Sequence, residues 1–446
     1  MFKKPRTLGI LTLSLWAALA ACGDKKSSTT EITFARFFGS CEAEYGKVTD
    51  VKQARGECGI ITSIVNQFNA TNKDGIVVKP QIVEWAPYYD QLTARIVSGD
   101  VPAVAVMHES VLGDFVARNL VEPLDDGLAS VGVAPADFTD HARRGVVIGD
   151  KVYALPFDTW SWLWHINLNM MKKAELVNPD GSPILPKTPD ELLAQAEKFK
   201  AATGKPYFSW PTVTEPAAPY RTFVTLVAQQ DAKLFAPGGK TIDIRSDAAK
   251  RALELINKLY ADGHVKTGAD YTAANQAFIN GEAGIVVVGT WTIDDFLAQS
   301  KQPSSPLANG YTVVPFPALF GKKAVFADGH SWVLLKGGTR DDKTRKAALT
   351  FLKFLWDNDY EWSRTGHLPA RRSVAESATY KELPFRANIT EITSTAYSVP
   401  SDVPRQRAVE LAISEEIGSM CLSKKPIADV QASIEERVNK LLAGTK

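Results

Sequence analysis

The chain has 446 residues, 45% of them hydrophobic, with 51 Lys and Arg against 50 Asp and Glu. A charge balance this close to neutral gives no indication of a nucleic-acid-binding or polybasic membrane-binding surface. The length exceeds that of one typical domain and favours two lobes, each with a full core.

The first thirty residues have the pattern of an export signal followed by a tether. Three basic side chains precede an apolar run, residues 8–19, that is shorter than the roughly 20 residues of a membrane-spanning helix. Small residues then stand directly before Cys22, an arrangement that resembles the bacterial lipobox. We predict a signal peptide at residues 1–21, lipid modification of Cys22, and a polar lipidated tether at residues 22–30. An ordinary cleaved signal that happens to end in Cys is the alternative.

Three further cysteines follow, and export implies an oxidising compartment. Cys41 and Cys58 flank a polar loop, so we predict a disulfide between them, which would stabilise the fold by roughly 3 kcal/mol. Cys421 would then be a buried thiol, although a Cys58–Cys421 bridge stays open. The cysteine spacing fits no zinc pattern and the six His are scattered, so the sequence predicts no metal site and no cofactor.

The first part of the mature chain alternates between strand and helix patterns. Strands are expected at 31–37, 76–83 and 101–107, and helices at 60–70 and 88–97. The third of these strands is continuously apolar, as buried parallel strands are. This alternation predicts an α/β fold with a wound sheet.

The same alternation returns further along the chain. A helix is expected at 189–200, because Thr188 can cap it and Pro189 fits its first position. Further helices are expected at 248–261, 342–356 and 427–442, and buried strands at 284–288 and 332–335. No internal repeat is present.

Five short segments, in this order along the chain, carry a family resemblance. They are Ser98-Gly99-Asp100-Val101-Pro102, Val121-Glu122-Pro123-Leu124-Asp125-Asp126, the run from Gly149 to Thr159, Gly289-Thr290-Trp291, and Gly366-His367-Leu368-Pro369-Ala370-Arg371-Arg372-Ser373. Together they resemble the substrate-binding proteins of bacterial carbohydrate ABC importers. The resemblance covers essentially the whole mature chain, and Ala103 departs from it by replacing a usual Asp.

The resemblance implies a periplasmic-binding-protein-like fold, with two discontinuous α/β lobes and a ligand cleft between them. The N-terminal lobe would contain residues 31–156 and 317–357, and the C-terminal lobe residues 157–316 and 358–446. The implied protein is no enzyme. It is an exported monomer on the periplasmic side or the cell surface, attached to the membrane by its lipid anchor only. Its implied partners are a small carbohydrate and an ABC permease with its cytoplasmic ATPase.

Sugar recognition needs two kinds of side chain. A pyranose has apolar faces on which aromatic rings stack, and hydroxyls that carboxylates, Arg, His and amides bind. Asp158 and Trp160 alternate on one face of a Trp-rich strand, where Trp162 and Trp164 fit a core equally well. The resemblance adds Trp291 as a stacking platform, together with Tyr220 and Arg371.

Polar residues at strand ends are further candidates, because open α/β sheets bind ligands at the carboxyl ends of their strands. His108 and Glu109 follow the third strand in this way. The remaining candidates, which also stand next to expected strands or in a late Pro-rich loop, are Glu84, Trp85, Gly329, His330 and Arg405.

Two alternatives compete with a sugar receptor. An exported glycoside hydrolase would use two carboxylates, for which Asp158 and Glu109 could be nominated. The same fold could also bind a glycerol-phosphate-type ester or a polyamine. The aromatic segment around Trp160 and the presence of Arg371 favour a di- or oligosaccharide of the maltose or trehalose type, or a sugar phosphate.

Overall fold

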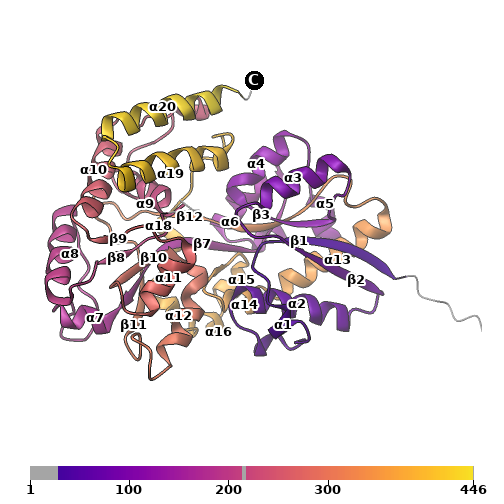
Figure 1. Cartoon of the computed structure of the whole chain (residues 1–446). Helices are drawn as coiled ribbons and strands as arrows, with labels where there is room; N and C mark the ends of the chain where they lie inside the picture. The colour runs from indigo at the N-terminus through magenta and orange to yellow at the C-terminus, as the bar shows by residue number, and fades with distance from the viewer. Residues whose placement is uncertain (1–28, 213–216, 445–446) are drawn as a thin grey trace, which may run out of the picture.

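Two β-sheets, each with its own helices, divide the chain into two bodies that lie side by side (Figure 1). The computed structural model describes residues 29–212 and 217–444. The predicted signal peptide, Cys22 and nearly all of the predicted tether fall outside these ranges. Among the described helices, none combines the length and the apolar character needed to cross a membrane.

The first sheet has five strands. Their order is β2 (Ile76–Ile82), β1 (Thr30–Arg36), β3 (Val104–His108), β13 (His330–Leu334) and β6 (Leu155–Pro156). β1 runs parallel to β2 and β3, whereas β13 is antiparallel to β3 and β6. β3 is buried along its whole length, as its continuous apolar pattern predicted. Because β13 lies between β3 and β6, a segment from late in the chain is an internal strand of the first sheet.

Helices cover this sheet through their apolar faces, and the sequence spacing predicted three of the four main ones. The main ones are α2 (Gly56–Thr71), α3 (Tyr88–Ser98), α4 (Glu109–Ala117) and α13 (Asp342–Asp357). Asp341 caps α13 by accepting a hydrogen bond from the backbone of Thr344. The ring of Phe351 on α13 packs edge-on against Phe34 of β1, with centroids 5.0 Å apart. Shorter elements here are α1 (Glu42–Tyr45), α5 (Asp125–Ser130), α6 (Asp140–Val146), β4 (Val147–Ile148), β5 (Lys151–Val152) and α14 (Asp359–Ser363).

The second sheet is built on β7 (Asp158–Asn167), all ten residues of which are buried. The sheet order is β15 (Ala396–Tyr397), β12 (Val325–Asp328), β7, β10 (Ile285–Gly289), β8 (Phe208–Ser209) and β9 (Val265–Lys266). β11 (Tyr311–Pro315) and β14 (Leu368–Pro369) also pair with β7. Trp162 and Trp164 belong to the core of this lobe.

The helices of the second lobe pack around this sheet. They include α7 (Leu168–Lys173), α8 (Pro189–Thr203), α9 (Ala217–Ala228), α10 (Asp247–Ala261), α11 (Tyr271–Ile279), α12 (Ile293–Ser300), α19 (Gln406–Ser423) and α20 (Ile427–Ala443). Four short helices, α15 (Arg372–Ala375), α16 (Ala378–Lys381), α17 (Arg386–Ile389) and α18 (Ile392–Thr395), precede α19. Thr188 caps α8 and Pro189 is its first residue, as predicted. The C-terminal helices α19 and α20, yellow in Figure 1, lie side by side next to α10.

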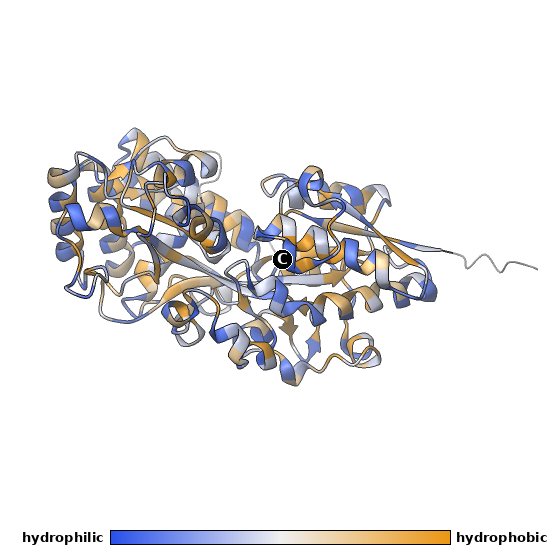
Figure 2. Ribbon diagram, turned by 90° about the horizontal axis from the view of Figure 1, so that it is seen from below, coloured by the Kyte–Doolittle hydropathy of each residue, from blue (hydrophilic) through white to orange (hydrophobic). Residues whose placement is uncertain are grey.

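Two separate hydrophobic cores correspond to the two sheets. Figure 2 shows the two bodies from below, with hydropathy marked along the ribbon. The chain passes from the first core to the second between Phe157 and Trp160, and returns between Phe326 and Trp332. A third segment, residues 362–371, runs along the junction, where β14 pairs with the first residues of β7. The lobe bounds expected from the sequence stay a proposal, and the sheets favour a second crossing next to Gly329 rather than near residue 317.

The disulfide prediction is confirmed. Cys41 and Cys58 are bonded, with their Cα atoms 6.1 Å apart, and the bridge joins the start of α1 to the start of α2. Cys421 is the free cysteine of the described chain. The side chain is partly buried against the core of the second lobe, and this burial raises the pKa of its thiol to about 12, which makes it a weak nucleophile.

Candidate ligand-binding site

A cavity of about 460 Å³ lies between the lobes. Its walls come from the end of β3, the start of α4 and part of α6 on one side, and from β7, α9, β12 and α19 on the other. Small-molecule sites typically have volumes of this order and occur at domain interfaces. Of the candidates from the sequence, the fold brings Trp85, His108, Glu109, Trp160 and Tyr220 together around it.

His108 is held in one orientation at the carboxyl end of β3. Its Nδ1 lies 2.7 Å from the hydroxyl of Tyr89, and the backbone N–H of His108 donates to the same hydroxyl. That hydroxyl can accept from the backbone and donate its own proton to Nδ1 at the same time. Burial lowers the pKa of His108 well below its usual value, so its ring is neutral.

Glu109, the first residue of α4, places a buried carboxyl group in the wall of the cavity. Its side chain fits a slot between two glycines: a Cβ on Gly329 would lie 2.6 Å from Oε1, and a Cβ on Gly145 would overlap Oε2. Oε1 has no hydrogen-bond partner in the protein. Burial raises the pKa of Glu109 well above its usual value, and the charges of Asp328 and Asp158 add to this. Glu109 is therefore a neutral acid that can donate a hydrogen bond to a ligand.

Asp328, at the end of β12, is a second buried acid in the wall. Its carboxylate accepts hydrogen bonds from the hydroxyl of Ser110 at 2.6 Å, from the Ser110 backbone at 3.1 Å and from the Gly329 backbone at 2.8 Å. Burial raises the pKa of Asp328 to about 6 despite these donors. The side chain joins the second sheet to the start of α4 in the first lobe.

The wall of the second lobe carries an arginine sandwiched among aromatic rings. The guanidinium carbon of Arg221 lies 4.6 Å from the centroid of Trp160 and 5.3 Å from that of Trp162. Its Nε is 3.4 Å from Oε1 of Glu410, too far for a good hydrogen bond, and neither atom has another partner. Nε1 of Trp160 is also buried without a partner.

A cation–π contact joins the two lobes across the cavity. The guanidinium carbon of Arg407, on α19, lies 4.0 Å from the ring centroid of Trp85, which follows β2 in the first lobe. Arg407 also donates to Oε2 of Glu410 at 2.8 Å. Trp85 thus presents a flat ring at the cavity, already covered on one side by a cation.

Three candidates lie in the junction and not in the cavity wall. Asp158 is completely buried, and its carboxylate accepts hydrogen bonds from the backbone N of His330 (3.1 Å), from Nδ1 of His330 (2.9 Å) and from Nε1 of Trp362 (2.6 Å). Gly329 permits this packing, because a Cβ there would lie 2.6 Å from the Asp158 carbonyl oxygen. These contacts give Asp158, Gly329 and His330 a structural role in the crossings.

The other candidates lie elsewhere. Trp291, in the short turn after β10, donates from Nε1 to the Tyr271 hydroxyl at 2.7 Å, and its ring packs edge-on against Trp160 at 5.4 Å. Arg371 pairs with Asp137 at 2.8 Å in the first lobe. Arg405 begins α19 and donates to the Gly444 carbonyl, and Glu84 is exposed after β2. Ligand binding by these four residues stays a prediction.

The wall also contains many residues that were not candidates from the sequence, among them six polar or aromatic side chains. They are Tyr89, His141, Arg221, Asp328, Arg407 and Glu410. Arg221 directly follows Tyr220, and Asp328 directly precedes Gly329. Adjacency in the sequence to these candidates was the signal that could have identified both residues. Arg407 and Glu410 lie on a helix that reaches the cavity only through the packing of α19 onto α9 and α4.

The fold and the position of the cavity define a class of protein. Two α/β lobes, joined by several chain crossings and enclosing a cavity, are the architecture of a receptor that holds a solute between its lobes. The sequence profile of the bacterial extracellular solute-binding protein family matches residues 63–388. The chain therefore belongs to this family, a family of exported binding proteins and not of enzymes.

Individual relatives agree with this assignment. A probable sugar-binding periplasmic protein of Brucella suis is 25% identical over 224 residues, 48% of this chain and 49% of the relative. The match thus spans about half the length of that relative. A maltotriose-binding protein of Pyrococcus abyssi is 22% identical over 404 residues, 86% of this chain and 79% of the relative.

Solved structures show the same fold at low sequence identity. The GacH receptor of Streptomyces glaucescens, described unliganded and with acarbose, has a TM-score of 0.77 at 18% identity, covering 94% of this chain and 100% of that chain. UgpB of Mycobacterium tuberculosis, in complex with glycerophosphocholine, has a TM-score of 0.73 at 16% identity, covering 93% of this chain and 99% of that chain. At these identities the likeness establishes the architecture.

Proposed function

We propose that the protein captures a neutral carbohydrate, a di- or oligosaccharide, in the cavity between its lobes. One observation carries this proposal: four buried polar atoms in the cavity wall have no hydrogen-bond partner in the protein. They are Oε1 of Glu109, Nε1 of Trp160, Nε of Arg221 and Oε1 of Glu410. Arg221 Nε and Glu410 Oε1 have only their 3.4 Å ion pair with each other, whereas Glu109 Oε1 and Trp160 Nε1 have no partner at all among the described residues. Buried polar groups are nearly always satisfied, so a ligand that brings hydroxyl groups would complete this wall.

The charges around the cavity favour a neutral ligand. Three arginines in the wall, Arg144, Arg221 and Arg407, are matched in number by three acids, and a fourth acid, Glu109, has a raised pKa. The acids that balance the arginines are Asp328, Asp402 and Glu410. A phosphate ester would need a surplus of cations and a polyamine a surplus of anions, whereas a sugar needs neither.

Aromatic rings supply the second requirement of a sugar site. Trp85 comes from the first lobe, while Trp160, Tyr220 and Phe326 come from the second. Rings on both sides can cover the apolar face of a pyranose when the lobes close on it. The sequence similarity to sugar-binding relatives from Brucella and Pyrococcus supports the same ligand class.

The proposal extends to transport and to location. The captured sugar is delivered to an ABC permease of the cytoplasmic membrane that works with a cytoplasmic ATPase. Cys22 carries the lipid anchor that keeps the monomeric protein at the membrane after removal of residues 1–21. Mass spectrometry of the N-terminal peptide from membranes tests the anchor, and release of a Cys22→Ser variant into the soluble fraction is the expected outcome.

A thermal-shift screen of residues 23–446 tests the ligand class. The panel contains maltose, maltotriose, trehalose and monosaccharides, with glycerophosphocholine and spermidine as the two competing classes. A carbohydrate at 100 times its Kd should stabilise the protein by about 2.7 kcal/mol. A shift with glycerophosphocholine or spermidine, and with no carbohydrate, would contradict the proposal.

A further inference from the structure

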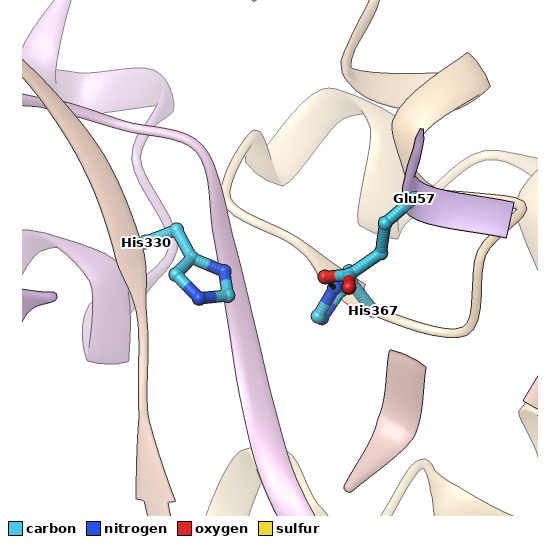
Figure 3. Close-up of side chains that lie close together, drawn as sticks. All are labelled: Glu57, His330 and His367. Atoms are coloured by element: carbon cyan, nitrogen blue, oxygen red, sulfur yellow. Dashed lines mark hydrogen bonds and ion pairs between the residues drawn. The ribbon is translucent and has the colours of Figure 1, made fainter. Parts of the chain in front are cut away.

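Two histidines and a glutamate meet at the junction of the lobes, outside the cavity. They are Glu57 from the start of α2, His330 from the start of β13 and His367 from the segment before β14 (Figure 3). One potential ligand atom of each residue lies within 4.8 Å of the other two. In Figure 3 the side chains of Glu57 and His330 point toward the ring of His367.

Hydrogen bonds fix how the two imidazoles present their nitrogens. Nδ1 of His330 lies 2.9 Å from the carboxylate of Asp158, so it carries a proton, and Nε2 becomes a ligand atom when the ring is neutral, with its proton released on metal binding. Nδ1 of His367 lies 3.2 Å from the hydroxyl of Thr290, and its Nε2 lies 2.8 Å from Oε1 of Glu57. A metal-binding histidine usually has its other nitrogen held by a carboxylate or another oxygen in this manner.

The electrostatic surroundings of the cluster are acidic. Asp158 is completely buried next to both histidines, at 3.9 Å from Nδ1 of His367. On the other side of Glu57, Asp294 accepts a hydrogen bond from the backbone of Gly56, and Asp295 is its neighbour in the chain. Carboxylates of like charge that lie close together repel one another, and a cation among them relieves that repulsion.

We propose that this cluster is a binding site for a zinc-like divalent ion, with Glu57, His330 and His367 as its protein ligands. Two imidazoles and one carboxylate are the donor set of three-ligand zinc sites, in which water takes the fourth position. Zinc bonds of about 2.1 Å require donors closer together than 4.8 Å, so the side chains draw inward on binding. The Glu57 side chain is 23% exposed, which gives it freedom to move and gives the ion a path from solvent.

The ion would connect parts of the chain that belong to different lobes. Glu57 and His330 belong to elements of the first lobe, while His367 leads into β14, which pairs with β7 of the second sheet. The sequence predicted no metal site, because His330 and His367 are brought to Glu57 only by two separate chain crossings. The site is independent of the ligand proposed for the cavity.

Metal binding can be measured on tag-free protein, residues 23–446, after treatment with a chelator. Co²⁺ is titrated with visible absorbance as the readout, and Zn²⁺ by calorimetry. We expect both titrations to give one ion per chain. The Co²⁺ complex should show the visible d–d bands of a four- or five-coordinate cobalt site. Glu57→Gln retains a hydrogen-bonding group for His367 but removes the charge, and should weaken binding at least tenfold.

A second histidine–glutamate pair provides the control. His264 lies 3.8 Å from Glu197 in the second lobe, so His264→Gln should bind the ion as the parent protein does. The unfolding midpoint of each variant in the presence of chelator verifies that it is folded. Absence of a one-to-one cobalt complex in the parent protein, or unchanged affinity in Glu57→Gln, would overturn the metal site. The sugar screen on chelated protein reports on the cavity separately.

Discussion

The carboxylate of Asp158 holds His330 twice, through the backbone N–H at 3.1 Å and through Nδ1 at 2.9 Å. The two residues stand on different crossings between the lobes, so this pair fastens one crossing to the other. Burial by itself would raise the pKa of Asp158, yet the charges of His330 and His367 and the hydrogen bonds from His330 and Trp362 lower it. Likewise, burial opposes a charged His330, but Asp158 raises its pKa.

Replacing Asp158 with Asn should destabilise the protein by roughly 3 kcal/mol, because a buried charge pair loses one partner. The pH dependence follows from the two shifts. The lowered pKa of Asp158 stabilises the fold above the unfolded pKa of about 3.9, and the raised pKa of His330 stabilises it below about 6.5. The deficit of Asp158→Asn should therefore be largest between these values and shrink as the pH rises through the folded pKa of His330.

Urea unfolding at pH 5, 6, 7 and 9 measures this deficit. Asp137→Asn is the control, because Asp137 forms a partly exposed pair with Arg371 and should change stability by less than about 1 kcal/mol. A deficit for Asp158→Asn that stays constant across the series would show that the charge pair does not fasten the crossings.

Glu109 should act in binding as a neutral hydrogen-bond donor. Glu109→Gln keeps a donor of similar size, and we expect the affinity for the sugar found by screening to stay within about tenfold. Glu109→Ala removes the donor and should cost roughly 1–3 kcal/mol of binding free energy. Calorimetry measures both variants, with the exposed Glu44→Gln as the unaffected control. Equal affinities for the Gln and Ala variants would remove Glu109 from the site.

Gly145 should matter although it offers no side chain to a ligand. A Cβ at this position would overlap the carboxyl group of Glu109, so Gly145→Ala should displace that group and weaken sugar binding. Gly418, inside α19, is the matched control, because a Cβ there meets nothing within 4 Å. Gly418→Ala should leave the affinity unchanged and stabilise the helix by about 0.5–1 kcal/mol. Binding by Gly145→Ala at parent affinity would contradict the close packing of the slot.

Asp328 should make the protein less stable as the pH rises from 4 to 6. Burial raises its pKa in the folded protein to about 6, so over this range the folded state holds a proton that the unfolded chain has lost. Asp328→Asn removes this titration. The stability of the variant relative to the parent should therefore increase from pH 4 to pH 6 and then level off. Chemical unfolding at intervals of half a pH unit measures the difference, and a flat difference would refute the raised pKa.

The Cys41–Cys58 disulfide should stabilise the first lobe. The bridge spans 17 residues, so a Cys41→Ser, Cys58→Ser double variant should be less stable by roughly 3 kcal/mol. Thermal unfolding of the oxidised parent and the double variant measures the loss. Cys421→Ser is the comparison for a single buried thiol that closes no loop. Equal midpoints for the parent and the double variant would show that the bridge does not limit stability.

Much of the fold was accessible from local sequence patterns. The cap at Thr188 marks a helix start through a single hydrogen bond, and β3 has the continuous apolar pattern of a buried strand. The pairing of Cys41 with Cys58 follows from short separation in an exported chain. These features depend on neighbours in the sequence, which explains why they could be predicted.

The composition of the site could be predicted only in part. His108 and Glu109 were found because a parallel strand presents its carboxyl end to the cavity. Arg407 and Glu410 were missed, since their positions depend on how α19 docks, which no local pattern encodes. Asp158 was expected at a crossing and lies at one, whereas His330 was expected within the first lobe and lies next to the second crossing, where the two side chains pair with each other. Side-chain direction at a crossing depends on three chain segments at once.

β13 is an internal strand of the first sheet, and this position affects the order in which the two sheets can form. β13 lies between β3 and β6, so β6 has no sheet partner until residues 330–334 have been made. The second sheet, except β14 and β15, is encoded entirely before that point. During synthesis from the N-terminus, the first sheet therefore stays incomplete, with the edge of β3 unpaired, while most strands of the second sheet have already been made. Synthesis of the first lobe begins before that of the second, but the sheet of the first lobe is completed later.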